Sequence, residues 1–243
     1  MVISHNIKRF FWHLNWEGPA KAIALVRFNL GLIVRAWHEQ RWDERFNVET
    51  GGRIALSRFT CNGDQEAGND YEPTPLKVLK QVSAMFPTNS RDFTFVDFGS
   101  GKGRMCIFAS SYPFKRIIGV EFAKELSEVA TANFGSLRNS TQRCFNLSSA
   151  CIDAADFQFP DGPCVLYFFN PFKADLMERV LDGLTKSLEA QPRKIILLYL
   201  NPENAHLFNK YPLLRRSEEM SVRVRYAGSR VDQLASLQVY ETL

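Results

Sequence analysis

Several common features are missing from this 243-residue sequence, and each absence narrows what the protein can be. The five cysteines form no C-x-x-C pair, so we expect reduced structural thiols and no metal site. The net charge of +4 is spread along the chain without a run of five basic residues, which leaves no strong signal for nucleic acid. An apolar stretch at residues 22–34 is interrupted by Arg27 and Asn29 and is too short to cross a bilayer. Because neither a signal peptide nor a transmembrane helix is indicated, we expect a cytoplasmic protein.

A glycine-rich stretch at residues 93–104, FTFVDFGSGKGR, is the most informative part of the sequence. Four β-prone residues lead to Asp97, and the residues after the last glycine have apolar side chains at helical spacing. The pattern predicts a buried strand, a tight turn and a helix, which together offer backbone N–H groups to a polar or anionic ligand at a sheet edge. Three glycines occupy alternate positions in the turn: Gly99, Gly101 and Gly103.

Residues near this turn narrow the choice of ligand. Arg104 stands where the dinucleotide fingerprint G-x-G-x-x-G requires glycine, which disfavours an NAD site. Glu121 ends the next predicted strand, 18 positions after Gly103, and this spacing suits an acid that binds ribose hydroxyls. A ligand that contains a ribose is therefore expected.

The rest of the sequence alternates strand and helix patterns. The most apolar strand, residues 164–169, is expected at the centre of the sheet with both faces covered. The predicted fold is α/β, with a seven-stranded Rossmann-like sheet that is mostly parallel, an antiparallel terminal hairpin and an N-terminal helical extension. Strands are predicted at 93–96, 116–120, 146–152, 164–169 and 194–200 and as a pair within 213–242 around Ala227-Gly228-Ser229, and helices at 76–86, from 104, and at 124–137, 174–188 and 202–209.

Residues 1–70 are predicted to form the N-terminal helical extension and a lid segment, and residues 71–243 the main domain. The first 17 residues are rich in aromatic and basic side chains, and a helix is predicted from Pro19 to about Trp42. Packing of this helix on the main domain is favoured, while contact with a partner or a membrane surface stays open.

Five motifs follow one another between residues 71 and 200: Tyr71-x-x-Thr74, FVDFGSGKGR, GVE at 119–121, Asp153-Ala154 and YFFNPF at 167–172. This ordered set resembles the class I S-adenosylmethionine-dependent methyltransferases. Within that superfamily it resembles the branch that contains the non-SET lysine methyltransferases of the telomeric-silencing type and uncharacterised bacterial relatives. Phe98 replaces the usual leucine of the family, and Asn170-Pro171-Phe172 lies between an Asn-Asn-Phe motif and the N-P-P-[FY] motif of amino methyltransferases.

The resemblance implies S-adenosyl-L-methionine as the cofactor and a seven-stranded methyltransferase sheet. It implies that the segment from Tyr71 to Pro75 folds over the cofactor, that Asp97 orders its methionine end, and that Asp153 accepts from the adenine amine. The implied cofactor-binding residues are Tyr71, Thr74, Asp97, Gly99, Ser100, Gly101, Gly103, Glu121, Asp153, Ala154 and Asn170.

The implied catalytic residues are Asn170, Phe172 and Tyr71. An amide at the tip of the fourth strand is expected to face the methyl acceptor, for which an amine such as a protein lysine is the first choice. Asn170 could instead cap the following helix, since Asn is a favoured cap. A small-molecule O- or N-methyltransferase and an inactive cofactor-binding protein are the alternative functions, and the sequence leaves open whether the acceptor is a protein or a small molecule.

Overall fold

The computed structural model describes residues 19–224 and 233–242, and contacts between residues divide the chain into two compact units, 1–44 and 45–243. This division lies earlier than the predicted boundary between residues 70 and 71. The reason is that residues 45–70 bond to the sheet unit at both ends. Asn47 Nδ2 donates to the Ser136 carbonyl (2.9 Å), and Lys173 N–H donates to the Ala67 carbonyl (2.9 Å).

Helix α2 (Pro19–Phe46) confirms the helix predicted from Pro19 and continues past Trp42. Among the described helices, none is long and apolar enough to cross a membrane. The aromatic and basic residues 1–17 lie outside the described residues, and the role of the extension stays a prediction.

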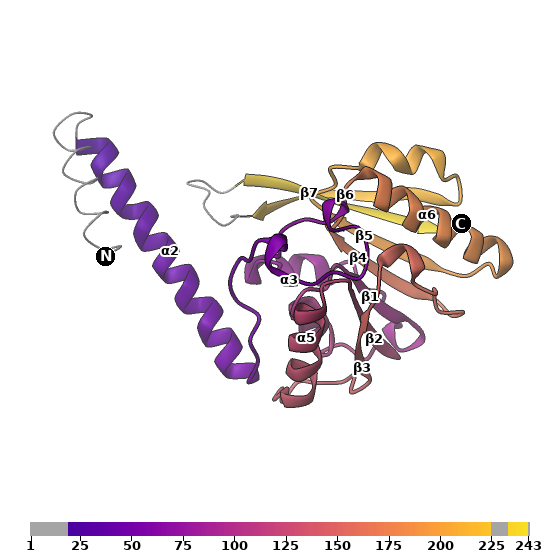
Figure 1. The fold of residues 1–243 in the computed structure, drawn as a ribbon, viewed down its shortest axis with the longest axis horizontal. Helices are drawn as coiled ribbons and strands as arrows, with labels where there is room; N and C mark the ends of the chain where they lie inside the picture. The colour runs from indigo at the N-terminus through magenta and orange to yellow at the C-terminus, as the bar shows by residue number, and fades with distance from the viewer. Residues whose placement is uncertain (1–18, 225–232, 243) are drawn as a thin grey trace. The chain divides into compact units, whose positions relative to one another are not determined.

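The sheet confirms the predicted fold class (Figure 1). The described strands occur in the order β3-β2-β1-β4-β5-β7-β6, with the first five in this order parallel and β7 antiparallel to both of its neighbours. The turn predicted at residues 227–229 lies outside the described residues. The strands are β1 (Thr94–Phe98), β2 (Arg116–Glu121), β3 (Leu147–Cys151), β4 (Cys164–Phe169), β5 (Ile195–Leu200), β6 (Leu214–Val224) and β7 (Gln233–Thr242).

The short helix predicted at residues 202–209 is present as a 3-10 helix, η5 (Ala205–Lys210), which begins three residues later and buries Leu207 and Phe208. The remaining helices are α3 (Leu76–Ser83), α4 (Arg104–Ala109), α5 (Lys124–Ser136), α6 (Ala174–Ala190) and the 3-10 turns η1 (Leu56–Arg58), η2 (Gln65–Ala67), η3 (Ser90–Asp92) and η4 (Ala154–Asp156).

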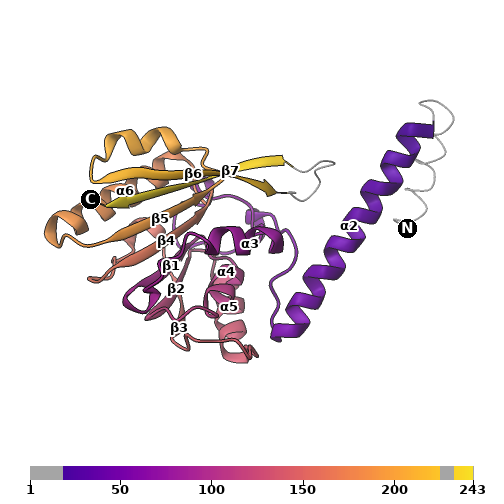
Figure 2. The same cartoon turned by 180° about the vertical axis from the view of Figure 1, so that it is seen from behind.

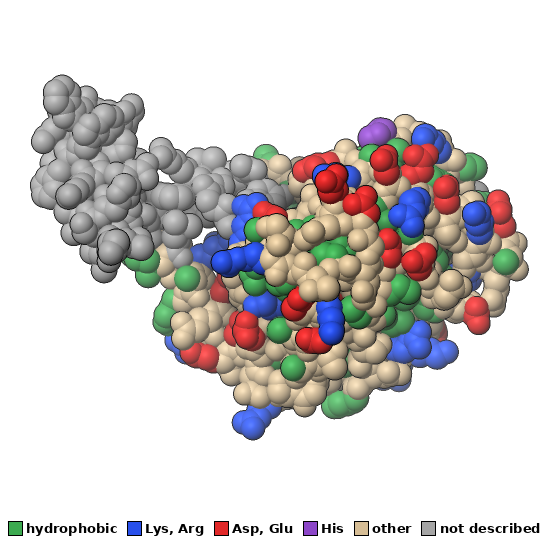
Figure 3. Space-filling model, in the orientation of Figure 1, with side chains coloured by type: hydrophobic (Ala, Val, Ile, Leu, Met, Phe, Trp, Pro, Cys, Tyr) green, Lys and Arg blue, Asp and Glu red, His purple; other side chains and the backbone are tan. Residues whose placement is uncertain are grey.

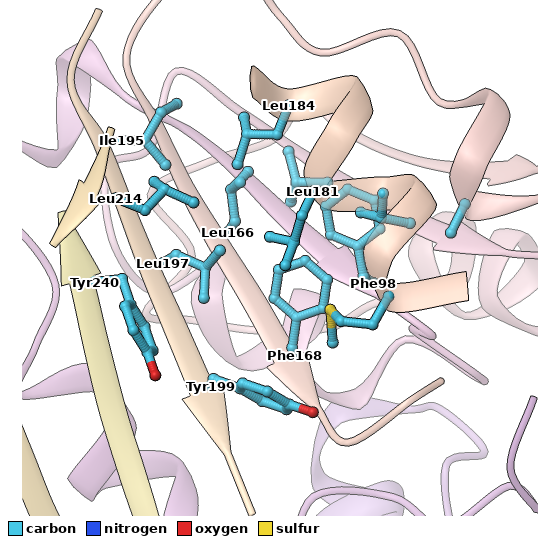
Figure 4. Packing of buried hydrophobic residues seen from close by; sticks show 14 of the residues in the cluster. Phe98, Leu166, Phe168, Leu181, Leu184, Ile195, Leu197, Tyr199, Leu214 and Tyr240 are labelled. Carbon is cyan, nitrogen blue, oxygen red and sulfur yellow. The ribbon is translucent and has the colours of Figure 1, made fainter. Parts of the chain in front are cut away.

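Alternate residues of the central strands face opposite sides of the sheet, so the sheet has a core on each face. On one side Val96, Leu166 and Leu197 pack against α6 and η5. Figure 4 shows this core, in which the Phe98 and Phe168 rings stack with their centroids 4.7 Å apart. The strand residues that alternate with these pack against α3 and α4 on the other side, which faces the viewer in Figure 2.

Helix α4 follows β1 and helix α6 follows β4 along the chain. The two helices belong to different cores, so the connections after β1 and β4 pass to opposite faces of the sheet. Strands β1 and β4 are neighbours, so their carboxyl ends form the switch point at which open α/β sheets bind ligands.

Candidate functional site

A pocket opens at this switch point and brings together most of the predicted site residues. It encloses about 840 Å³, open solvent at its mouth included. Gly101 and Gly103 are not among the described lining residues. The predicted residues that line the pocket are Tyr71, Thr74, Asp97, Gly99, Ser100, Glu121, Asp153, Ala154, Asn170 and Phe172.

The glycine turn lies between two motifs from distant parts of the chain. Gly99 and Gly101 have φ values of 72° and 53°, which L side chains rarely adopt. A Cβ on Gly99 would lie 2.5 Å from Pro171, and one on Gly101 would lie 2.2 Å from the Tyr71 ring. The turn therefore needs glycine at these two positions, because side chains there would collide with Pro171 and Tyr71.

Glu121 at the end of β2 holds the glycine turn in place. One carboxylate oxygen accepts from the Gly101 N–H (2.8 Å) and the other from the Ala123 N–H (2.9 Å). Burial raises the pKa of Glu121 to about 6, although these backbone N–H groups oppose the shift. The acid predicted to bind ribose therefore also fixes the turn beside it.

Asp97 lies within β1, so the strand extends two residues beyond its predicted end. The Cys106 thiol of α4 donates to Asp97 Oδ2 over 3.6 Å. Burial raises the pKa of Asp97 to about 7, and the Glu121 charge adds to the shift while the Cys106 bond opposes it. Asp97 therefore changes its charge near neutral pH.

Asp153 has the local role of a turn residue as well as a place in the pocket. It caps η4, and its Oδ1 accepts from the Ala155 N–H (2.9 Å). Its other oxygen lies 3.9 Å from Arg179 Nη1. Ala154 follows as the first residue of η4 and is buried.

Tyr71 and Thr74 are buried side chains on the upstream wall of the pocket. Tyr71 Oη donates to the Thr50 carbonyl (2.6 Å), and the Thr74 hydroxyl shares a hydrogen bond with Tyr167 Oη (3.0 Å). Residues 71–75 are thus packed against the sheet unit, and their closure over a cofactor stays a prediction.

Asn170 follows β4 in a left-handed conformation, with φ of 41°. Its backbone carbonyl accepts from Asn69 Nδ2 (2.7 Å), and its side-chain Oδ1 accepts from Tyr199 Oη (3.3 Å). The alternative of a helix cap is wrong, because the N-cap position of α6 is Lys173. Phe172, two residues on, is buried, and its carbonyl accepts from Asn204 Nδ2 (3.0 Å).

Three residues that the sequence reasoning did not select also take part. Thr50 and Tyr199 are fully buried and bond to Tyr71 and Asn170, and Arg104 lines the pocket at the start of α4. A charged residue next to a glycine turn, inside an otherwise apolar helix, was the one available signal for Arg104. Thr50 lies in a segment without periodicity and Tyr199 in an apolar strand, so neither had a comparable signal.

On the face of the sheet unit seen in Figure 3, acidic and basic side chains are interspersed, and the described residues there form no continuous basic patch. Among the described residues, no three His, Cys, Asp or Glu side chains gather as metal ligands.

Neither a protein-family model nor a curated protein matches the sequence. Solved structures do match the fold. A putative RNA methyltransferase from Pyrococcus horikoshii is 14% identical with a TM-score of 0.52, over 76% of this chain and 92% of that one. The N-methyltransferase NodS from Bradyrhizobium japonicum, solved with S-adenosyl-L-homocysteine, is 13% identical with a TM-score of 0.50, over 77% and 96% of the two chains. These similarities show that the chain has the seven-stranded, Rossmann-like methyltransferase fold.

Proposed function

We propose that this protein is an S-adenosylmethionine-dependent methyltransferase whose acceptor is an amine, with a protein lysine as the first candidate. The observation that carries the proposal is that motifs spread along the chain line one pocket at the ends of β1, β2 and β4. They are Tyr71-x-x-Thr74, the glycine turn with Asp97, Glu121, Asp153-Ala154 and Asn170.

The residues fit this cofactor chemically. The Ser100 hydroxyl is buried without a hydrogen-bond partner among the described residues, which suits a polar ligand. Each Glu121 oxygen accepts one backbone N–H and keeps a lone pair for a ribose hydroxyl. In this assignment Glu121 binds the ribose, Asp153 the adenine amine and Asp97 the ammonium of the methionine end.

The cofactor supplies a methyl group activated by a positively charged sulfur, so the protein mainly has to orient the acceptor and exclude water. Asn170 Oδ1 is held by Tyr199 Oη and keeps a second lone pair, which can accept from an amine N–H. The aromatic rings of Phe172 and Tyr71 favour positive charge developing on the amine nitrogen.

The charge of the pocket supports an amine over a polyanionic acceptor. Five acidic residues line it, and Arg104 is the one basic residue among the described lining. Arg53 lies 3.4 Å from Asp70, and Arg179 lies 3.9 Å from Asp153. An acidic lining attracts a cationic side chain and repels phosphate.

Radiolabelled cofactor incubated with the purified protein and fractionated lysate tests the proposal. We expect label in protein or small amines, in a form stable to base, because an N-methyl bond survives conditions that hydrolyse methyl esters. Glu121→Ala should bind the cofactor roughly a hundredfold more weakly by calorimetry, since hydrogen bonds to a charged partner are lost. Glu128→Ala, which removes an exposed glutamate of α5, is the matched control.

Label confined to nucleic acid would contradict the amine acceptor. Cofactor binding without any transfer would indicate the inactive cofactor-binding alternative. No binding of the cofactor by the folded wild-type protein would overturn the proposed function itself.

Cofactor affinity is expected to rise with pH near neutrality. Ionised Asp97 attracts the cofactor ammonium and protonated Asp97 does not, and its raised pKa of about 7 puts this change between pH 6 and 7.5. Over that window the ionised fraction, and hence the affinity, should grow roughly eightfold. Calorimetry at pH 6 and pH 7.5 measures the cofactor affinity, and in Asp97→Asn the affinity should change little between these pH values. If the affinity of the variant rose as much as that of the wild type, the pH dependence would belong to another group, such as Glu121.

A further inference from the structure

Cys106 of α4 contacts an acidic residue of the pocket without lining the pocket itself. Its side chain is fully buried and is not among the described lining residues, whereas Asp97 lines the pocket and is 4% exposed. The Cys106 thiol donates to Asp97 Oδ2 over 3.6 Å. Burial raises the pKa of Cys106 well above its ordinary value, so the sulfur keeps its hydrogen and stays a donor at neutral pH.

Within the described part of the chain, this thiol is the one hydrogen-bond donor to the Asp97 side chain. The Ser100 hydroxyl is buried as well, yet it has no hydrogen-bond partner among the described residues. A buried carboxylate is costly unless donors or cations surround it. Because the thiol engages Oδ2, the Oδ1 atom of Asp97 is left for a cationic ligand in the pocket.

Gly119 of β2 leaves the space for this arrangement. It is the register partner of Asp97 in the neighbouring strand. A Cβ added to Gly119 would lie 2.6 Å from Ser100 Oγ and 3.4 Å from Cys106 Sγ. Glycine at this position therefore leaves room that the hydroxyl and the thiol occupy.

The ionised form of Asp97 is only weakly supported. Burial raises the pKa of Asp97 to about 7, the thiol bond opposes this rise, and the Glu121 charge adds to it. Glu121 also titrates near this range, because burial raises its pKa to about 6. Arg104 of α4 and Tyr167, opposite Asp97 in β4, line the same pocket, but arginine and tyrosine do not ordinarily change charge near pH 7. The other titratable residues of the lining are Asp70, Tyr71, Glu72 and Asp153.

We propose that Cys106 is a positioning residue for the ammonium of the cofactor: its thiol holds Asp97 Oδ2 and supports the negative charge, and Asp97 Oδ1 receives the ammonium. This inference rests on the proposed function, because it concerns the same cofactor. A thiol is a weak donor, so the ammonium of the ligand supplies the larger part of the stabilisation that the carboxylate needs. Cys106 acts through Asp97 and does not touch the cofactor.

Calorimetry with S-adenosylmethionine at pH 6 and pH 7.5 on Cys106→Ala tests the inference. Loss of the thiol should move the titration of Asp97 upward by roughly half to one pH unit. Since the ionised form binds the ammonium, the affinity should fall roughly three- to ninefold at pH 6 but only about 1.5- to threefold at pH 7.5. A structural defect alone would lower the affinity by the same factor at both pH values.

Three controls show whether the thiol acts through the carboxylate. Cys144→Ala removes another buried thiol, which donates to the Asn146 carbonyl (3.8 Å), and should leave the ratio of the affinities at the two pH values unchanged. 5′-Methylthioadenosine has the same nucleoside without the amino-acid part, so wild type and Cys106→Ala should bind it equally well. In an Asp97→Asn background, adding Cys106→Ala should leave the ratio unchanged.

The same ratio of affinities in Cys106→Ala and the wild type would overturn the inference, and so would an equal loss of affinity for both ligands. Should Cys106→Ala fail to fold, Cys106→Val, which also lacks a donor but fills more of the space, is measured in its place. A wild-type affinity for S-adenosylmethionine that does not rise between pH 6 and pH 7.5 would overturn the role of Asp97 and the inference with it. A wild-type protein that binds neither S-adenosylmethionine nor 5′-methylthioadenosine would instead overturn the proposed function.

Discussion

Asn170→Ala is expected to slow methyl transfer by roughly a hundredfold or more, because positioning supplies much of the catalysis and misplacing an acceptor is costly. Cofactor affinity should stay within about threefold, since the other cofactor contacts remain. The side chain is fixed by Tyr199 and the backbone by Asn69, so the amide is held toward one position in the pocket. Label transfer under single-turnover conditions measures the rate of the chemical step.

Asn201 provides a matched control for this substitution. It follows β5 as Asn170 follows β4, it also has a positive φ (52°), and it is not among the described lining residues. Asn201→Ala should therefore introduce about the same backbone strain as Asn170→Ala, about 1 kcal/mol, but should not slow methyl transfer. Asn170→Gly should relieve the strain and still be slow. If Asn170→Ala and Asn201→Ala transferred methyl groups equally well, the role of Asn170 and the amine acceptor would both be withdrawn.

Gly101→Ala is expected to have the largest effect on stability among single methyl additions to the glycine turn. The new Cβ would lie 2.2 Å from the Tyr71 ring, and the residue has a left-handed φ of 53°. Strain of about 1–2 kcal/mol and overpacking of about 1–3 kcal/mol together lower the free energy of unfolding by about 2–5 kcal/mol. The melting temperature should fall by roughly 10 °C.

Gly135→Ala is the control for this change. Gly135 lies near the end of α5, and a Cβ there would meet nothing within 4 Å. Alanine is expected to stabilise the helix by about 0.5–1 kcal/mol, because it loses less backbone freedom on folding than glycine. Thermal unfolding followed by circular dichroism compares the two variants. A melting temperature of Gly101→Ala equal to that of the wild type would show that Tyr71 can move away from the turn at little cost.

Local patterns were sufficient to predict most of the sheet unit. The run of apolar residues at 164–169 matches β4 residue for residue, because a strand covered on both faces requires continuous hydrophobicity. The order of strand ends also predicted which acids would share a pocket, since parallel strands place their carboxyl ends at one edge.

Contacts between distant parts of the chain were not predictable in the same way. The 45–70 segment shows no period, and its structure depends on partners such as Ser136, 89 positions from Asn47. Tyr199 reads as one more apolar residue of β5, yet its hydroxyl determines how the Asn170 amide lies. Such roles come from tertiary packing, which a single sequence does not encode in any local pattern.

The position of β7 has a consequence for how the protein is made. Although β7 is synthesised after the other six described strands, it lies between β5 and β6 in the finished sheet. Until β7 leaves the ribosome, the apolar strand IILLYL of β5 has an open edge that can pair with another nascent chain. Co-translational folding must therefore wait for β7, and chaperone protection of this edge matters most during the interval between synthesis of β5 and of β7.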